Sequence, residues 1–206
     1  AHRAGRHAEA LRSFHRALQR APDDPFAHFN LGTALEEQGR REDAVTCYRR
    51  VLALRPAHLK AWNKLGSLLL AFDGVADAAG HYRRAIVIHP DQPVLHHNLG
   101  VALHRLGRAD EAAACLRRAL QFAPDYPDAL INLGNVLREG GEAKQALRYF
   151  QHTLVLDPAN AKLHSVAGAT MESLALHDEA LASFRRALAV APELAAAHWN
   201  LALILL

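Results

Sequence analysis

Proline recurs in this chain at a constant interval of 34 residues. The six prolines with this spacing are Pro22, Pro56, Pro90, Pro124, Pro158 and Pro192. A period of roughly 20 to 50 residues is the sequence signature of proteins built from stacked structural repeats. We therefore expect one small unit repeated along the chain, with each unit packed on its neighbours.

Other positions recur in step with these prolines. When the recurring proline is numbered position 32 of each unit, position 20 is always alanine: Ala10, Ala44, Ala78, Ala112, Ala146 and Ala180. Position 24 is large and apolar in every unit: Phe14, Tyr48, Tyr82, Leu116, Phe150 and Phe184. Positions 7 and 8 read Leu-Gly at 31–32, 65–66, 99–100 and 133–134, and less regularly at 167–168 and 201–202.

The spacing of these positions predicts two helices in each unit. At about 100° per residue, positions 4, 7, 8 and 11 share one face of a first helix, and positions 20, 24 and 27 form the apolar stripe of a second. Glycine at position 8 and alanine at position 20 leave room where the two helices cross. The large residue at position 24 is expected to fill the remaining gap.

Glycine and proline mark the expected ends of the helices. Glycine at position 15 favours the left-handed backbone that ends a first helix, in Gly5, Gly39, Gly107 and Gly141. Asp73 and Ala175 take its place in two units. Proline at position 32 ends the second helix, and Pro25, Pro93 and Pro127 open the next hairpin at position 1.

The spacing of positions 4, 7, 8, 11, 20, 24, 27 and 32 resembles the tetratricopeptide repeat over the whole chain. The resemblance implies an all-α, right-handed superhelical solenoid of antiparallel helical hairpins, with about 12 helices in a single domain, residues 1–206. The expected parts are a second helix at 1–24, full repeats at 25–58, 59–92, 93–126, 127–160 and 161–194, and a first helix at 195–206.

Composition argues against several classes of partner. The chain carries 24 basic and 21 acidic residues, and only 6% of its residues are aromatic. A nucleic-acid-binding protein usually concentrates basic charge beside stacking aromatics, so we expect no nucleic-acid partner. No apolar stretch is long enough to span a bilayer, and we expect no membrane partner.

Arginine pairs recur at positions 25 and 26, and we interpret them as a solvated outer face, with a weak anionic partner as the alternative.

The residues that often carry chemistry show no catalytic pattern. None of the 14 histidines stands four residues from another on a helix, so we expect no metal site. His28, His96, His164 and His198 all occupy position 4, a packing position. Cys47 and Cys115 lie two repeats apart, about 20 Å in a helical stack, which indicates unpaired thiols in a reducing, cytoplasmic compartment. We expect no enzyme activity and no cofactor in this segment.

The candidate binding surface is the side of the first helices that faces away from the core. Positions 2, 5, 9 and 12 lie there, and by resemblance to tetratricopeptide proteins they line a concave groove. Asparagine recurs beside them at position 6, where an amide can hold the backbone of an extended peptide. The candidate residues are Asn30, Lys60, Asn63, Lys64, His97, Asn98, His104, Arg105, Ile131, Asn132, Asn135, Arg138, Trp199 and Asn200.

Two resemblances describe what this groove would bind. The Asn-Leu-Gly triplets resemble those in the repeat arm of O-linked N-acetylglucosamine transferase, which grips substrate peptides. Lys60 and Lys64, with Asn30, resemble part of the clamp by which chaperone-binding tetratricopeptide domains hold a peptide carboxylate. With His97 and His104 further along, we expect a preference for acidic or phosphate-bearing segments. Phe29, Ile131 and Trp199 are candidate apolar anchors.

These observations favour a non-enzymatic scaffold that binds a protein or peptide, and they leave two alternatives open. The segment could be the substrate-recognition arm of a larger glycosyltransferase, because residues 198–203 resemble a last repeat before such a domain. It could also assemble end to end with other copies, because the last helix exposes Trp199, Leu203 and Leu206 and lacks the second helix of its hairpin.

Overall fold

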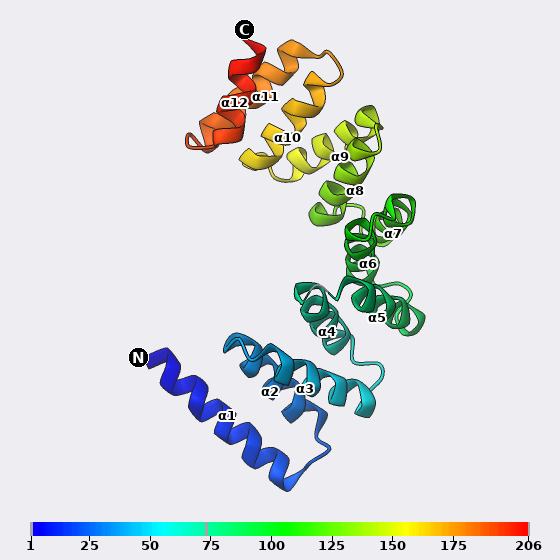
Figure 1. Cartoon of the computed structure of the whole chain (residues 1–206), viewed down its shortest axis with the longest axis vertical. Helices are drawn as coiled ribbons and strands as arrows, with labels where there is room; N and C mark the ends of the chain where they lie inside the picture. The colour runs from blue at the N-terminus through cyan, green and yellow to red at the C-terminus, as the bar shows by residue number, and fades with distance from the viewer. Residues whose placement is uncertain (1, 73, 206) are drawn as a thin grey trace. The chain divides into compact units, whose positions relative to one another are not determined.

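The computed structural model describes the backbone of residues 2–72 and 74–205, with side chains from Glu9 onward within those ranges. This part of the chain forms twelve helices and no strand, which confirms the all-α hairpin architecture (Figure 1). The helices are α1 (His2–Arg20), α2 (Pro25–Glu37), α3 (Arg41–Leu54), α4 (Leu59–Ala71), α5 (Val75–Ile88), α6 (Pro93–Arg105), α7 (Ala109–Phe122), α8 (Pro127–Glu139), α9 (Ala143–Leu156), α10 (Ala161–Glu172), α11 (His177–Val190) and α12 (Ala195–Ile204).

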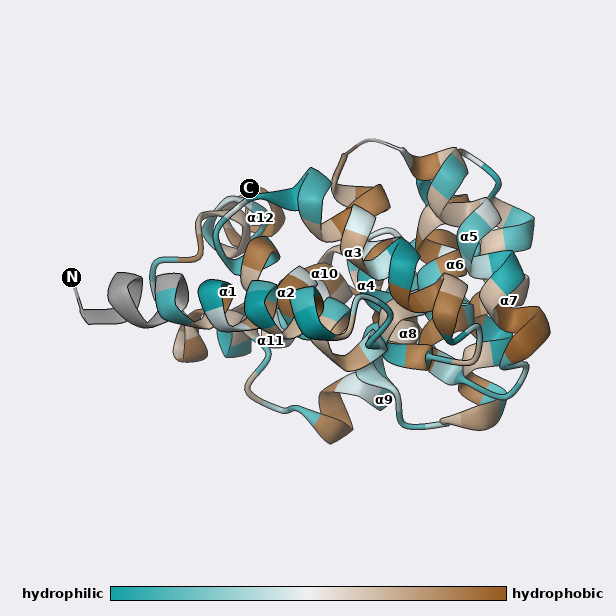
Figure 2. Ribbon diagram, turned by 90° about the horizontal axis from the view of Figure 1, so that it is seen from below, coloured by the Kyte–Doolittle hydropathy of each residue, from teal (hydrophilic) through white to brown (hydrophobic). Residues whose placement is uncertain are grey.

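The chain divides into two compact units, residues 1–102 and 103–206, with the division inside α6. In the first unit, each helix from α1 to α4 packs on the next. In the second unit, the same holds from α7 to α11, and α10 also contacts α12. Most helices carry hydrophobic and hydrophilic residues on different sides (Figure 2). The single continuous solenoid over residues 1–206 stays a prediction.

Proline marks the helix ends as the sequence predicts. Pro25, Pro93 and Pro127 are the first residues of α2, α6 and α8. Their fixed φ suits the first helical turn, where a missing backbone N–H breaks no hydrogen bond. Each second helix ends two residues before the recurring proline, as at Leu54 before Pro56.

Four hairpins are closed by a large second-helix side chain against a first-helix glycine. A Cβ added to Gly66 would lie 2.4 Å from Tyr82 Cζ, and one added to Gly134 would lie 2.3 Å from Phe150 Cε1. Gly32 meets Tyr48 and Gly168 meets Phe184 in the same way. Tyr48, Tyr82, Phe150 and Phe184 are all fully or almost fully buried. The predicted packing of position 24 against position 8 is therefore present in both units.

Replacing one of these glycines tests the packing directly. We expect Gly134→Ala to lower the free energy of unfolding by about 2 kcal/mol, because the new methyl group overlaps Phe150. The double variant Gly134→Ala/Phe150→Leu should lose about 1 kcal/mol less unfolding free energy than the two single variants lose together. Leucine suits this position, because Leu116 occupies it in another repeat.

Chemical denaturation of the four proteins in this cycle measures the coupling. Gly80→Ala in α5 is the control, because a Cβ there meets no atom within 4 Å and alanine favours the helix. Additive losses at Gly134 and Phe150 would contradict the packing role.

The turn between the two helices of a hairpin requires a left-handed residue at position 15. Gly39, Gly107 and Gly141 have φ of 76°, 74° and 83°. Ala175 has the same conformation, with φ of 58°, although it carries a Cβ. The turn therefore imposes this backbone whatever the residue, at a cost of about 1 kcal/mol for alanine. Asp73, the other replacement, lies outside the described residues.

The prediction for Gly5 is wrong. Helix α1 begins at His2 and continues through Gly5 to Arg20, so no helix ends at this glycine. Continuing the helix keeps its backbone hydrogen bonds, and glycine inside a helix costs only about 1 kcal/mol.

The left-handed turn can be tested with a reciprocal pair of substitutions. Ala175→Gly should raise the free energy of unfolding by about 0.5 kcal/mol, because relief of strain exceeds the extra entropy of the unfolded glycine. Gly107→Ala should lower it by about 1 kcal/mol, since its Cβ would meet no atom within 4 Å and only the backbone is affected. Thermal and urea unfolding measure both; equal signs for the two changes would contradict the account.

Candidate functional site

The histidines at position 4 hold the loop that precedes their own helix. In four first helices the ring Nε2–H donates to the carbonyl of the recurring proline. The distances are 2.8 Å for His28 to Pro22, 2.8 Å for His96 to Pro90, 3.0 Å for His164 to Pro158 and 2.7 Å for His198 to Pro192. Trp62 does the same with its indole N–H, 2.6 Å from the Pro56 carbonyl. These histidines are structural, as their position in the sequence indicates.

A second contact ties position 23 of the second helix to the backbone of position 4. His81 Nε2–H donates to the Trp62 carbonyl at 2.9 Å, and Ser183 Oγ donates to the His164 carbonyl at 2.9 Å. The His81 ring also lies on Trp62, with 4.5 Å between ring centroids. Burial lowers the pKa of His81, and the Arg84 and Arg49 charges lower it further. Its neutral form is therefore favoured in the folded chain.

This shift predicts a loss of stability in acid. Because the folded pKa of His81 lies below its ordinary value of 6.5, the stabilisation is present above that pH. It is lost as the pH falls from there through the folded pKa, since the unfolded chain binds the proton more tightly. We expect His81→Ser to flatten the fall in unfolding free energy between about pH 7.5 and pH 5.

Serine is the matched replacement because Ser183 makes the equivalent hydrogen bond. Urea titrations of both proteins at several pH values give the slopes. The other histidines titrate in both, so only the difference between the slopes reports on His81. Identical slopes would show that His81 is not responsible.

In the first unit, the predicted groove lysine is already paired. Lys64 Nζ lies 3.2 Å and 3.1 Å from the two carboxylate oxygens of Glu36. The Tyr48 hydroxyl donates to the same carboxylate at 2.8 Å and lies 3.3 Å from Thr33 Oγ1. Burial, together with the neighbouring Glu36, raises the pKa of Tyr48, so it remains a donor. Part of the expected positive charge is thus neutralised by an acidic residue of the preceding hairpin.

Predicted groove residues from two hairpins of the first unit form a short hydrogen-bonded chain. Asn98 Nδ2 donates to Asn63 Oδ1 at 2.7 Å, and His97 Nδ1 lies 3.1 Å from Asn98 Oδ1. His97 is buried, at 8% exposure. The Tyr82 hydroxyl is buried without a hydrogen bond of ordinary geometry, although Asn98 is among its polar neighbours. The contact links position 5 of one hairpin to position 6 of the next.

The remaining candidates of the first unit are more open. Asn30 and Lys60 are exposed, on α2 and α4. Phe29, expected as an apolar anchor, packs instead on Tyr48 and His58, with centroid distances of 5.6 Å and 4.9 Å. It therefore forms part of the wall between two hairpins, and only part of its surface is accessible to a ligand.

In the second unit, the predicted candidates lie on α6, α8 and α12. His104 Nε2 lies 2.8 Å from Glu139 Oε2, and Arg138 lies 4.0 Å from the other oxygen of that carboxylate. The set also contains the exposed Arg105 and the half-buried Ile131, Asn132 and Asn135.

The last helix carries two further candidates. Trp199 is 70% exposed and Asn200 is half-buried. Leu203, expected to be uncovered, is 56% exposed, and Leu206 lies outside the described residues.

Sequence reasoning missed the two acidic partners, Glu36 and Glu139. Glu36 could have been found from its place in the repeat, because it occupies position 12, one of the positions assigned to the groove. It lies 28 residues before Lys64, and this separation places the two side chains on facing turns of adjacent first helices. The charge of the groove depends on such pairs between hairpins, which a count of basic residues overlooks.

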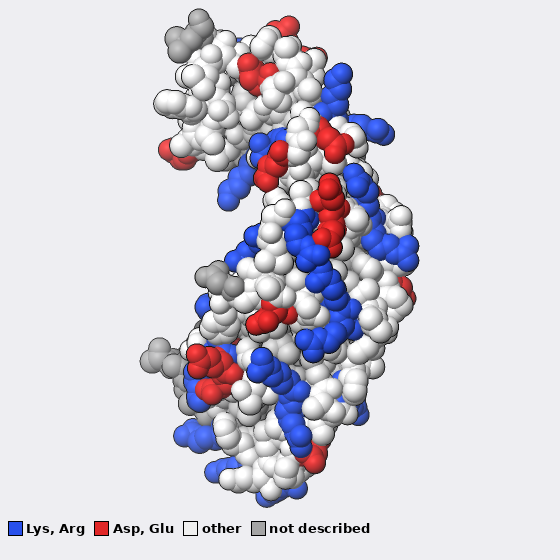
Figure 3. All heavy atoms as spheres, turned by 45° about the vertical axis from the view of Figure 1, so that its right-hand side comes forward, with Lys and Arg blue, Asp and Glu red and all other residues white. Residues whose placement is uncertain are grey.

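The arginine pairs of the second helices lie among polar and acidic neighbours. Arg50 pairs with Asp23, and Arg118 donates to Gln121 Oε1 at 2.7 Å while covering the Phe122 ring. On the face that Figure 3 shows, basic and acidic side chains are interspersed. Such exposed pairs contribute little individually, as expected for a solvated face.

The described residues were also compared with the requirements of a metal site, a disulfide and a membrane-spanning helix. No group of three or more His, Cys, Asp or Glu side chains in this part of the chain is arranged to hold a metal ion. Burial raises the pKa of Cys47, which keeps the thiol protonated, and no disulfide joins it to Cys115. Among the described helices, none is long and apolar enough to cross a membrane.

Comparison with known families agrees with the repeat found in the sequence. Two family models match, each described as tetratricopeptide repeat. One matches residues 1–45 and 29–93, and the other matches residues 91–159. A comparison with curated proteins gives no match.

Several solved structures have a similar fold. YrrB, described as a protein with an unusual peptide-binding site, gives a TM-score of 0.74 at 22% identity, over 90% of this chain and 96% of that chain. MamA gives 0.73 at 24% identity, over 81% and 91%. PilF of Pseudomonas aeruginosa gives 0.81 at 17% identity, over 97% and 91%. At these identities the likeness shows the fold alone.

Proposed function

Because the chain belongs to the tetratricopeptide repeat family, whose members generally mediate protein–protein interactions, we propose that it binds an extended, acidic peptide segment along its first-helix face. The observation that carries this proposal is the hydrogen-bonded chain from Asn98 to Asn63. It orients the Asn63 amide from within the protein, so a ligand would not have to order it. The proposal assigns no reaction to these residues.

A preference for acidic ligands is supported by charge. Residues 1–102 contain 14 basic and 10 acidic residues, whereas residues 103–206 contain 10 and 11. The first unit therefore carries the positive surplus, and the exposed Lys60 lies on its first-helix face. Lys64 is held by Glu36, and a ligand carboxylate would have to compete with that contact. YrrB, which has the same fold, is itself described as a peptide-binding protein.

Removing the competing carboxylate should strengthen binding. Glu36→Gln keeps an acceptor for the Tyr48 hydroxyl and releases the positive charge of Lys64. We expect an aspartate-rich peptide to bind the wild-type chain more tightly than a lysine-rich peptide of equal length. Glu36→Gln should raise the affinity for the aspartate-rich peptide about threefold, which corresponds to the free energy of one exposed ion pair. Fluorescence anisotropy with labelled peptides measures both.

The double change Glu36→Gln/Lys64→Gln is the control. It should return the affinity to the wild-type value or below, because the released charge is removed again. If the gain survives in the double variant, Lys64 does not contact the ligand. Equal affinity for the two peptides would overturn the acidic preference.

A further inference from the structure

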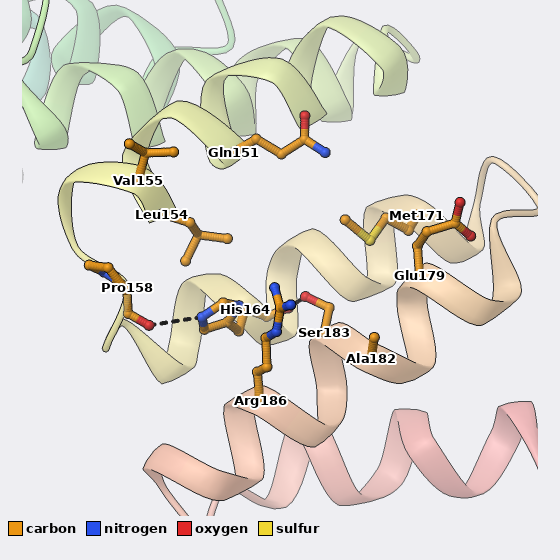
Figure 4. Close-up of a pocket in the computed structure, with 10 residues that line it drawn as sticks. All are labelled: Gln151, Leu154, Val155, Pro158, His164, Met171, Glu179, Ala182, Ser183 and Arg186. Atoms are coloured by element: carbon orange, nitrogen blue, oxygen red, sulfur yellow. Dashed lines mark hydrogen bonds between the residues drawn. The ribbon is translucent and has the colours of Figure 1, made fainter.

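A separate hollow lies in the second unit, between α9, α10 and α11. Its volume is about 530 Å³, within the range that binds small ligands or one or two side chains. The residues that line it are Gln151, Leu154, Val155, Pro158, His164, Met171, Glu179, Ala182, Ser183 and Arg186 (Figure 4). It contains none of the residues assigned to the groove, and it opens beside the second helices.

The wall of the hollow is mostly apolar. Leu154, Met171 and Ala182 contribute only carbon and sulfur atoms. Its two inner polar side chains are already used, because His164 donates to the Pro158 carbonyl and Ser183 donates to the His164 carbonyl. An apolar side chain entering this space would therefore leave no buried polar group unpaired.

The rim of the hollow carries opposite charges at its two ends. Arg186 extends beside His164, and Glu179 lies beside Met171 (Figure 4). Both belong to α11 and stand seven residues apart, which is about 10.5 Å along a helix axis. Neither makes an ion pair or hydrogen bond with another described residue. The rim is thus negative near the start of α11, at Glu179, and positive seven residues later, at Arg186.

Two side chains that line the hollow stand at repeat positions where other second helices carry arginine. Gln151 occupies position 25, where four of the other second helices carry arginine. Ala182 occupies position 22, where the preceding hairpin has Arg148. Both side chains are shorter than arginine. Val155 at the edge of the hollow is 78% exposed, and Val87 at the same repeat position is 83% exposed.

We infer that this hollow binds an amphipathic helix of a partner protein, lying antiparallel to α11. On the partner helix, an acidic residue faces Arg186, a large apolar residue three or four positions later enters the hollow, and a basic residue seven positions after the first faces Glu179. Residues so spaced share one helical face, and seven residues of helix span the same distance of about 10.5 Å.

A helix suits this hollow better than an extended segment. The backbones of α9 and α11 are hydrogen-bonded within each helix, so they offer no strand edge to pair with an extended chain. An extended backbone would place unpaired amide groups against Leu154 and Met171. A helix satisfies its own backbone, and the antiparallel direction brings opposite ends of the two helix dipoles together.

The inference can be tested with a designed probe and the full chain. The probe is a capped helical peptide of about 15 residues, rich in alanine and glutamine, with glutamate at i, leucine at i+4 and lysine at i+7. Its charge-swapped form is the matched control. We expect isothermal titration to show tighter binding of the probe than of the swapped peptide by about threefold or more. The Glu179→Lys/Arg186→Glu variant should reverse this preference.

Ala182→Arg should weaken binding of both helical peptides at least about tenfold by filling the hollow. Ala182 is exposed, and arginine is tolerated at the same position as Arg148, so the variant should fold. Binding of the aspartate-rich peptide should remain unchanged in it, which separates this site from the groove. Undiminished probe binding in Ala182→Arg, or equal affinity for both helical peptides, would overturn the inference. Tighter binding of a proline-interrupted, extended form of the probe would do the same.

Discussion

The fold depends on the contact between a first-helix glycine and a large second-helix side chain, which is present in four hairpins. At Gly66 and Gly134 the ring edges of Tyr82 and Phe150 fill the space that a Cβ would occupy. Close approach at this point sets the separation of the two helices, and every other contact of the hairpin is built on that separation. The contact is local in sequence, only 16 residues from glycine to aromatic ring, so each hairpin can form it independently.

Most of this architecture could be predicted because the same residue pattern occurs in successive units of the chain. A single glycine or proline has many explanations, whereas one that returns every 34 residues has few. The helix boundaries, the small-to-large packing and the packing role of the position-4 histidines followed from this regularity. Gly5 was misassigned because the glycine rule of the other units does not hold there, where α1 continues through the glycine. At Gly5 the glycine is present without the turn, whereas at Ala175 the left-handed turn is present without the glycine. The turn, not the residue, therefore imposes the backbone conformation of Ala175.

The candidate site was less predictable because its character arises between repeats. The sequence indicates that Lys64 and His104 lie near the groove, but not that Glu36 and Glu139 contact them. Phe29 belongs to the expected face, yet its ring packs between Tyr48 and His58. Such pairings depend on the offset of one helix against the next by about a turn, which a one-dimensional pattern does not resolve. The hollow near Arg186 was missed for a related reason, because the residues that line it come from two successive repeats.

Position 12 has a consequence for how proteins of this kind diversify. Successive first helices place Glu36, Leu70, His104, Arg138 and Glu172 there, which are acidic, apolar, titratable, basic and acidic in turn. Apart from Glu36, which accepts a hydrogen bond from the Tyr48 hydroxyl, these side chains lie outside the glycine–aromatic contact that closes a hairpin. Mutation can therefore alter the ligand chemistry of one repeat while the folding of that repeat is preserved. Selection acting on such a chain can explore new partners in small, nearly independent steps.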